Sequence, residues 1–152
     1  MASDLRFVMT ALKIVTDVER IGDLAVNVAK RVLELNPHPP EGVYADVQAL
    51  SAEVMTALRD ALDAFVNGDA ELAERVIKGD AAIDALNHQV IRRILAAAAH
   101  DAHEVSRWLA LSSISRYLER IGDHATNIAE MVIYTVRAYD VRHHGGPAKR
   151  GE

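Results

Sequence analysis

The chain has 152 residues, of which half are hydrophobic, 26% are charged and only 5% are aromatic. This length suits one domain, the composition excludes a disordered chain, and the scarcity of aromatic residues argues against a β-sandwich or barrel. A net charge of −5 disfavours broad electrostatic attraction to nucleic acid. Without cysteine, the chain has no disulfide framework and no thiolate site for zinc or an iron–sulfur cluster.

The sequence also lacks the marks of membrane insertion or secretion. No apolar run approaches the roughly 20 residues of a membrane span. The first residues, MASDLRF, have neither the basic patch nor the apolar stretch of a signal peptide. We therefore expect a cytoplasmic, helical protein.

The first predicted helix covers about residues 4–36, with Ser3 placed to cap it. The proline-rich segment 37–42 ends it and forms a linker, because proline cannot continue a helix. Apolar residues recur along the helix in alternating steps of four and three, which is the spacing of a heptad stripe. The stripe consists of Phe7, Ala11, Ile14, Val18, Ile21, Ala25, Val28, Val32 and Leu35.

Three more helices are predicted, over about residues 43–67, 69–99 and 102–142, followed by a disordered tail at 143–152 that is rich in glycine and charge. Asp69 is placed to cap the third helix, and Asp101 with Glu104 resembles a capping box before the fourth. The expected core stripes are Val43, Val47, Leu50, Val54, Ala57, Ala61 and Phe65 in the second helix, and Leu72, Val76, Ile83, Leu86, Val90 and Ile94 in the third. The fold class is therefore all-α.

An internal repeat links the first and last helices. Residues 17–33 are DVERIGDLAVNVAKRVL and residues 117–133 are YLERIGDHATNIAEMVI, so Glu-Arg-Ile-Gly-Asp recurs after 100 residues. A repeat of this length is a three-helix unit. Residues 43–142 would form one complete unit, and residues 1–36 would be the last helix of an incomplete one.

Carboxylates occupy matching positions in this repeat. The third predicted helix adds a pair of aspartates, Asp80 and Asp84, which are four residues apart and therefore share one helix face. Because the third and fourth helices follow a tight turn, they should pack antiparallel, with Asp80 level with Asp123 and Asp84 level with Glu119. Four converging carboxylates favour a hard cation such as Mg²⁺, Mn²⁺, Ca²⁺ or ferric iron. The candidate ligands are Asp80, Asp84, Glu119 and Asp123 for one complete site, Glu19 and Asp23 for half of another, and Asn27 and Asn127 beside them.

Other interpretations of these residues remain open. The acid pairs could form a solvated face with Arg20 and Arg120. Gly22 and Gly122 lie inside the two copies of the repeat, and each lowers helix stability by about 1 kcal/mol relative to alanine. This cost indicates either a local purpose or close helix packing. His88 could extend the acid stripe or be an exposed polar residue, and we interpret His124 as a surface residue.

Three segments resemble the PhoU family of phosphate-uptake regulators. ASDLRFVMTALKIVTDVERIGDLAVNVAKR and SRYLERIGDHATNIAEMVIY are similar to the family's two third-helix segments, and GDAELAERVIKGDAAIDALN to the second helix of its C-terminal repeat. The resemblance implies a tandem of three-helix bundles whose E/DxxxD motifs bind iron foremost, with manganese, zinc or magnesium as alternatives. It also implies two further helices before Ser3, with the acid pair that completes Glu19 and Asp23.

The resemblance further implies a function. The family is a cytoplasmic, non-enzymatic and often dimeric adaptor that lies between the phosphate ABC importer and a sensor histidine kinase, peripheral to the inner membrane face through these partners. It restrains phosphate uptake and phosphate-starvation signalling. Because the stripe of the first helix lacks its own helix pair, we expect association into a homodimer.

Two other classes compete with this interpretation. A ferritin-like di-metal carboxylate protein would use Glu-x-x-His motifs, and none occurs in the sequence. A histidine phosphotransfer bundle would need one exposed reactive histidine, for which His88 and His124 are the candidates.

Overall fold

The computed structural model describes residues 2–35, 42–100 and 104–143, and these residues form four helices and no strand. The helices are α1 (Ala2–Leu35), α2 (Val43–Asn67), α3 (Ala70–His100) and α4 (Val105–His143). They confirm the all-α class, with bounds within a few residues of those predicted. Most of the predicted linker and nearly all of the predicted tail lie outside the described residues.

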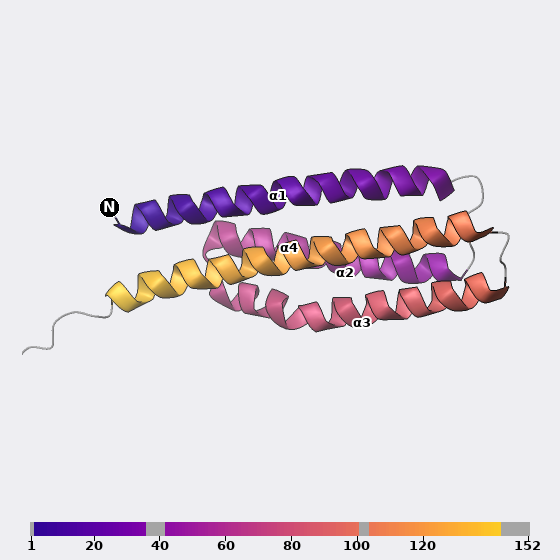
Figure 1. The fold of residues 1–152 in the computed structure, drawn as a ribbon. Coiled ribbons are helices and arrows are strands. Elements are labelled where there is room, and N and C mark those ends of the chain that lie inside the picture. The colour runs from indigo at the N-terminus through magenta and orange to yellow at the C-terminus, as the bar shows by residue number, and fades with distance from the viewer. Residues whose placement is uncertain (1, 36–41, 101–103, 144–152) are drawn as a thin grey trace, which may run out of the picture.

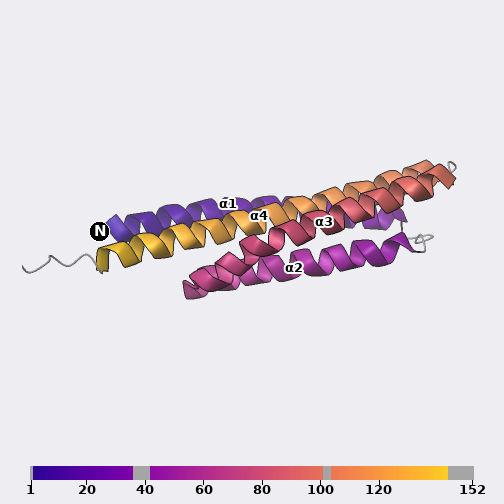
Figure 2. The same cartoon turned by 90° about the horizontal axis from the view of Figure 1, so that it is seen from below.

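The helices α2, α3 and α4 form a three-helix bundle, and α1 lies along the outer side of α4 (Figures 1 and 2). Within the described residues, the backbone of α1 packs against α4 alone. One side-chain contact reaches further, because the rings of Phe7 and Phe65 stack with their centroids 5.9 Å apart. No described helix combines the length and apolarity that crossing a membrane requires.

Local sequence explains the sharp turn between α2 and α3. Gly68 follows α2 with a φ of 64°, a left-handed conformation that glycine adopts without steric cost. Asp69 then caps α3, because its Oδ1 accepts a hydrogen bond of 2.9 Å from the Leu72 backbone N–H. The predicted Asp69 cap is thus confirmed.

Of the other two predicted caps, one is wrong and one lies outside the described residues. The helix α1 begins at Ala2, so Ser3 lies inside the helix and the prediction that it is the cap is wrong. The end of a helix depends on the hydrogen bonds of a whole turn, so a single capping residue does not fix where the helix begins. Asp101 lies outside the described residues, and Glu104 pairs with Arg107 at 3.2 Å.

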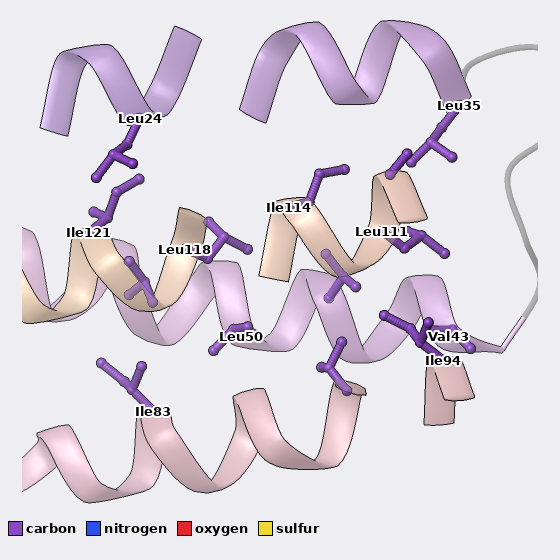
Figure 3. Close-up of a cluster of buried hydrophobic side chains, with 14 residues drawn as sticks. Leu24, Leu35, Val43, Leu50, Ile83, Ile94, Leu111, Ile114, Leu118 and Ile121 are labelled. Carbon is purple, nitrogen blue, oxygen red and sulfur yellow. The ribbon is translucent and has the colours of Figure 1, made fainter. Parts of the chain in front are cut away.

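The core follows the predicted stripes of α2 and α3. Figure 3 shows Val43 and Leu50 of α2 and Ile83 and Ile94 of α3 pointing into the space beneath α4. Leu50 is fully buried, and among the described residues α4 contributes more buried apolar side chains than any other helix. Its buried apolar residues are Ala110, Leu111, Ile114, Leu118, Ile121, Ala125, Ile128, Ala129 and Val132.

The predicted stripe of α1 is only half correct. Ile14 and Leu35 are buried and Ile21 and Val28 are partly buried, but Val18 is 44% exposed. The predicted stripe and the observed face share Ile14, Ile21, Val28 and Leu35, but α1 is turned about its axis so that the residue before each remaining predicted position in this stretch faces α4. The face against α4 runs instead through Thr10, Ile14, Asp17, Ile21, Leu24, Val28, Arg31 and Leu35.

The two copies of the repeat pack against each other in opposite directions. The hydroxyls of Thr10 and Thr135 lie 3.1 Å apart at one end of this contact, and Leu24 points toward Ile121 near its middle (Figure 3). Residues 21–24 and 121–124 therefore lie level with each other. The repeat in the sequence becomes an approximate two-fold relation between α1 and α4.

Candidate functional site

The candidate site lies on the face shared by α3 and α4, and hydrogen bonds define the register of these helices. The buried Ser115 hydroxyl donates to Asn87 Oδ1 across the helix pair. Further along, the Thr126 hydroxyl donates to Asp80 Oδ1 over 3.0 Å. These contacts confirm the antiparallel packing and place Asp80 within a turn of Asp123 along the pair.

The carboxylates of this face influence each other electrostatically. Partial shielding from water raises the pKa of the Asp123 carboxyl above its ordinary value, and the charges of Asp80 and Asp84 raise that pKa further. His124 and Arg120 oppose this rise. Three of the four predicted ligands of the complete site thus share one electrostatic environment.

The side chains do not close around a metal as they stand. Among the described residues, no group of three or more histidine, aspartate or glutamate side chains is gathered tightly enough to hold an ion. One oxygen of Asp80 is already engaged by Thr126. The donors nevertheless have the chemistry of a hard-cation site, since all four are carboxylates. Binding would require side-chain rotations at the surface, and the assignment of Asp80, Asp84, Glu119 and Asp123 as ligands stays a prediction.

The half site on α1 has a different environment. Glu19 and Asp23 are exposed, on a helix that has only α4 beside it within the described residues. Asn27 is half-buried, and Asn127 is exposed in a shallow groove between α1 and α4. The groove has a volume of about 400 Å³ and is lined by Lys13, Thr16, Asp17, Asn127, Glu130 and Met131. The roles of these residues as ligands likewise stay predictions.

The two histidines differ from each other. His88 is exposed, as one interpretation held, and its Nδ1 lies 2.9 Å from the Asp84 backbone carbonyl. His124 was interpreted as a surface residue, which is wrong, because it is about four-fifths buried and its Nδ1 lies 2.7 Å from Asp17 Oδ1. The approach of α1 covers His124, and no pattern within α4 alone reveals that contact.

The two glycines of the repeat also differ. A Cβ on Gly122 would lie 3.3 Å from Ile83 Cγ2, so this glycine permits the close approach of α3 and α4. A Cβ on Gly22 would meet nothing within 4 Å. Close packing therefore explains Gly122 and leaves Gly22 without a packing partner in the described structure.

Several contacts between helices escaped the sequence analysis. Asp17 pairs with His124 between α1 and α4, Asn87 bonds Ser115 between α3 and α4, and Arg93 pairs with Asp46 between α3 and α2. Heptad spacing could have identified Asn87 and Asp17, because each occupies a core-facing position of an otherwise apolar stripe.

The structure is a three-helix bundle with an added repeat helix and with pairs of carboxylates on its surface. These features are typical of helical-bundle proteins built from tandem repeats. A family model described as "PhoU domain" matches residues 1–32 and 47–132. The chain belongs to the PhoU family.

Similar proteins agree with this assignment. The chain is 44% identical over 146 residues to a phosphate-specific transport system accessory protein PhoU homolog of Pseudomonas putida, and 32% identical over 145 residues to the PhoU protein of Escherichia coli K12. The crystal structure of PhoU from Pseudomonas aeruginosa matches 91% of this chain, with a TM-score of 0.86 and 40% identity. The chain spans 57% of the length of the P. putida relative and 66% of the P. aeruginosa structure.

Proposed function

We propose that the chain is a regulator of phosphate uptake and of phosphate-starvation signalling, acting as a non-enzymatic adaptor in the cytoplasm. The observation that carries this proposal is the pair of Glu-Arg-Ile-Gly-Asp helices packed against each other, in a chain whose relatives are named as accessory proteins of phosphate-specific transport. The proposed partners are the ATPase subunit of the phosphate ABC importer and the sensor histidine kinase.

The shape of the bundle supports an adaptor role. Its largest buried side chains are apolar apart from Ser115. Its charged groups are spread over the surfaces of long helices, where a partner protein can contact them. The groove between α1 and α4 is open and shallow, unlike the enclosed pocket that a small-molecule substrate usually occupies.

We propose in addition that this adaptor binds a metal on the face of α3 and α4. The ligands are Asp80, Asp84, Glu119 and Asp123, and iron is the foremost candidate, with manganese, zinc or magnesium as alternatives. The raised pKa of Asp123 supports this proposal, because a cation would relieve the repulsion that contributes to it. A metal that binds only the folded chain raises the melting temperature. Addition of iron or manganese should therefore raise the Tm of the parent but not of an Asp80→Asn, Asp84→Asn variant.

The adaptor role is tested in bacteria that lack their own PhoU-family protein and carry a phosphate-starvation reporter. Expression of the chain should lower the reporter signal in phosphate-rich medium. The tagged chain should also co-purify with the importer ATPase subunit or the sensor kinase.

A matched variant makes this test specific. Leu118→Ala removes a core side chain and should weaken both effects through loss of fold, whereas Val66→Ala alters a 78% exposed residue and should leave both intact. An unchanged reporter, together with recovery of neither partner by the folded parent, would overturn the proposal.

A further inference from the structure

A polar pair lies inside the contact between α1 and α4. Asp17 Oδ1 and His124 Nδ1 are 2.7 Å apart, and both side chains are about four-fifths buried. One turn to either side of Asp17 along α1, Ile14 is buried and Ile21 is partly buried. Because these surroundings keep most water away from the pair, each of the two polar groups depends on the other for a hydrogen bond.

The other polar residues on this face of α1 have partners that do not depend on where α1 lies. Arg31 pairs with Glu34, one turn along its own helix, at 2.8 Å. Thr10 contacts Thr135, but the Thr135 hydroxyl also donates to the Met131 carbonyl of its own helix over 2.8 Å. A threonine hydroxyl finds such a carbonyl four residues back in any helix, whatever lies beside it.

Apolar packing alone leaves the level of α1 on α4 ambiguous. The apolar residues that α1 directs toward α4 include a series with a period of seven, namely Ile14, Ile21, Val28 and Leu35. A slide of α1 by seven residues, about 10 Å, keeps the same face toward α4 and regains most of the apolar packing. The connection to α2, residues 36–42, does not fix the level either, since seven residues reach up to roughly 23 Å.

The two possible slides differ in what opposes them. A slide toward the beginning of α4 would carry Leu35 past the end of that helix and expose a side chain that is now buried. A slide in the other direction keeps α1 beside α4, but it sets Asp17 level with Met131, which has no side-chain donor for a carboxylate. It also sets His124 level with Leu24, which has no polar side-chain atom. The polar pair is therefore what opposes the second slide.

We propose that the Asp17–His124 pair selects the level at which α1 lies on α4. At this level the two copies of Glu-Arg-Ile-Gly-Asp lie side by side, and a slide of seven residues would separate them by about 10 Å. The repeat itself does not supply the pair, since Tyr117 and Leu24 stand at the equivalent positions. The two residues thus position one copy of the motif against the other. This inference goes beyond the proposed regulatory function and does not depend on it.

A distance between the two helices tests the level directly. Because the chain has no cysteine, spin labels on Lys30→Cys of α1 and Glu130→Cys of α4, both exposed, report one distance by pulsed EPR. Dilution with unlabelled chain restricts the measurement to distances within one chain. The parent should show a single distance. The Asp17→Leu, His124→Leu variant, folded with equal helicity by circular dichroism, should show a second population about 5–10 Å shorter, because the slide moves residue 30 toward residue 130.

Two further variants separate selection by this pair from a general weakening of the contact. Asp17→His with His124→Asp restores a hydrogen-bonded pair with its residues exchanged, and it should keep the single parental distance. Thr10→Val with Thr135→Val removes another contact between the same helices and should also keep that distance. A single parental distance in the folded Asp17→Leu, His124→Leu variant would overturn the proposal. A second distance in the parent, in the exchanged pair or in the valine variant would overturn it as well.

Discussion

The helices α1 and α4 carry the same Glu-Arg-Ile-Gly-Asp segment in different surroundings. α4 packs against three helices, and its Gly122 lies beneath Ile83. α1 packs its backbone against one helix within the described structure, and its Gly22 has no neighbour at the Cβ position. The comparison teaches that the motif itself specifies a packing surface, and that the surrounding helices decide whether the surface is buried.

The largest expected difference is between Leu118 and Val18, which occupy equivalent positions of the repeat. Leu118→Ala should lower the free energy of unfolding by about 2–5 kcal/mol, because it opens a cavity in the bundle. Val18→Ala, at the equivalent and 44% exposed position of α1, should change that free energy by no more than about 0.5 kcal/mol. Both are measured by urea denaturation. Equal losses would break the comparison.

The glycines provide the next contrast. Gly122→Leu should cost about 1–3 kcal/mol, because its side chain would overlap Ile83 in a well-packed core. Gly22→Leu should instead stabilise the chain by up to about 1 kcal/mol, because leucine is a better helix former than glycine. The two variants should thus change the urea midpoint in opposite directions, and a loss of stability in Gly22→Leu would contradict the open surroundings of this glycine.

A buried polar contact sharpens the comparison further. Ser115 is fully buried and bonds Asn87, whereas the equivalent Val15 is exposed. Ser115→Ala should cost about 1–2 kcal/mol, because it leaves a buried amide oxygen without its donor. Replacement of both partners, as Ser115→Ala with Asn87→Leu, should recover part of this loss. A neutral single variant in thermal unfolding would contradict this account of the contact.

The smallest effect concerns pH. Because folding raises the pKa of Asp123, the folded protein binds more protons than the unfolded chain at mildly acidic pH. Stability therefore falls as pH rises from the ordinary aspartate pKa through the raised value, and the penalty is complete above that value. Asp123→Asn should be slightly more stable than the parent at pH 7 and should lose this advantage near pH 4. Urea denaturation of the metal-free proteins across this range checks the sign, and a variant less stable than the parent at pH 7 would contradict it.

Much of the fold could be predicted from the sequence, because the signals are local. The apolar spacing of α2 and α3 predicts their buried faces, and Asp69 predicts its own cap. The antiparallel register of α3 and α4 followed from the short connection between them. These features depend on neighbours in the chain or on a single hairpin.

The errors share a different cause. The exposure of Val18 and the partial burial of His124 depend on how α1 docks against α4, a contact between segments about 100 residues apart. Hydrophobic spacing shows that a face can be buried, and it does not show how many helices are present to bury it. The arrangement of the carboxylates could not be predicted from local sequence patterns either. Rotamers and hydrogen bonds, such as that of Thr126 to Asp80, decide whether the four carboxylates converge.

The most direct test of the account is the amount of metal bound by native mass spectrometry after incubation with iron, manganese, zinc or magnesium. Three proteins are compared: the parent, the Asp80→Asn, Asp123→Asn variant on α3 and α4, and the Glu19→Gln, Asp23→Asn variant on α1. Circular dichroism confirms that each is folded. The account predicts metal on the parent and on the Glu19→Gln, Asp23→Asn variant, and none on the Asp80→Asn, Asp123→Asn variant. Absence of metal from the parent, or its retention by the folded Asp80→Asn, Asp123→Asn variant, would contradict the proposed site.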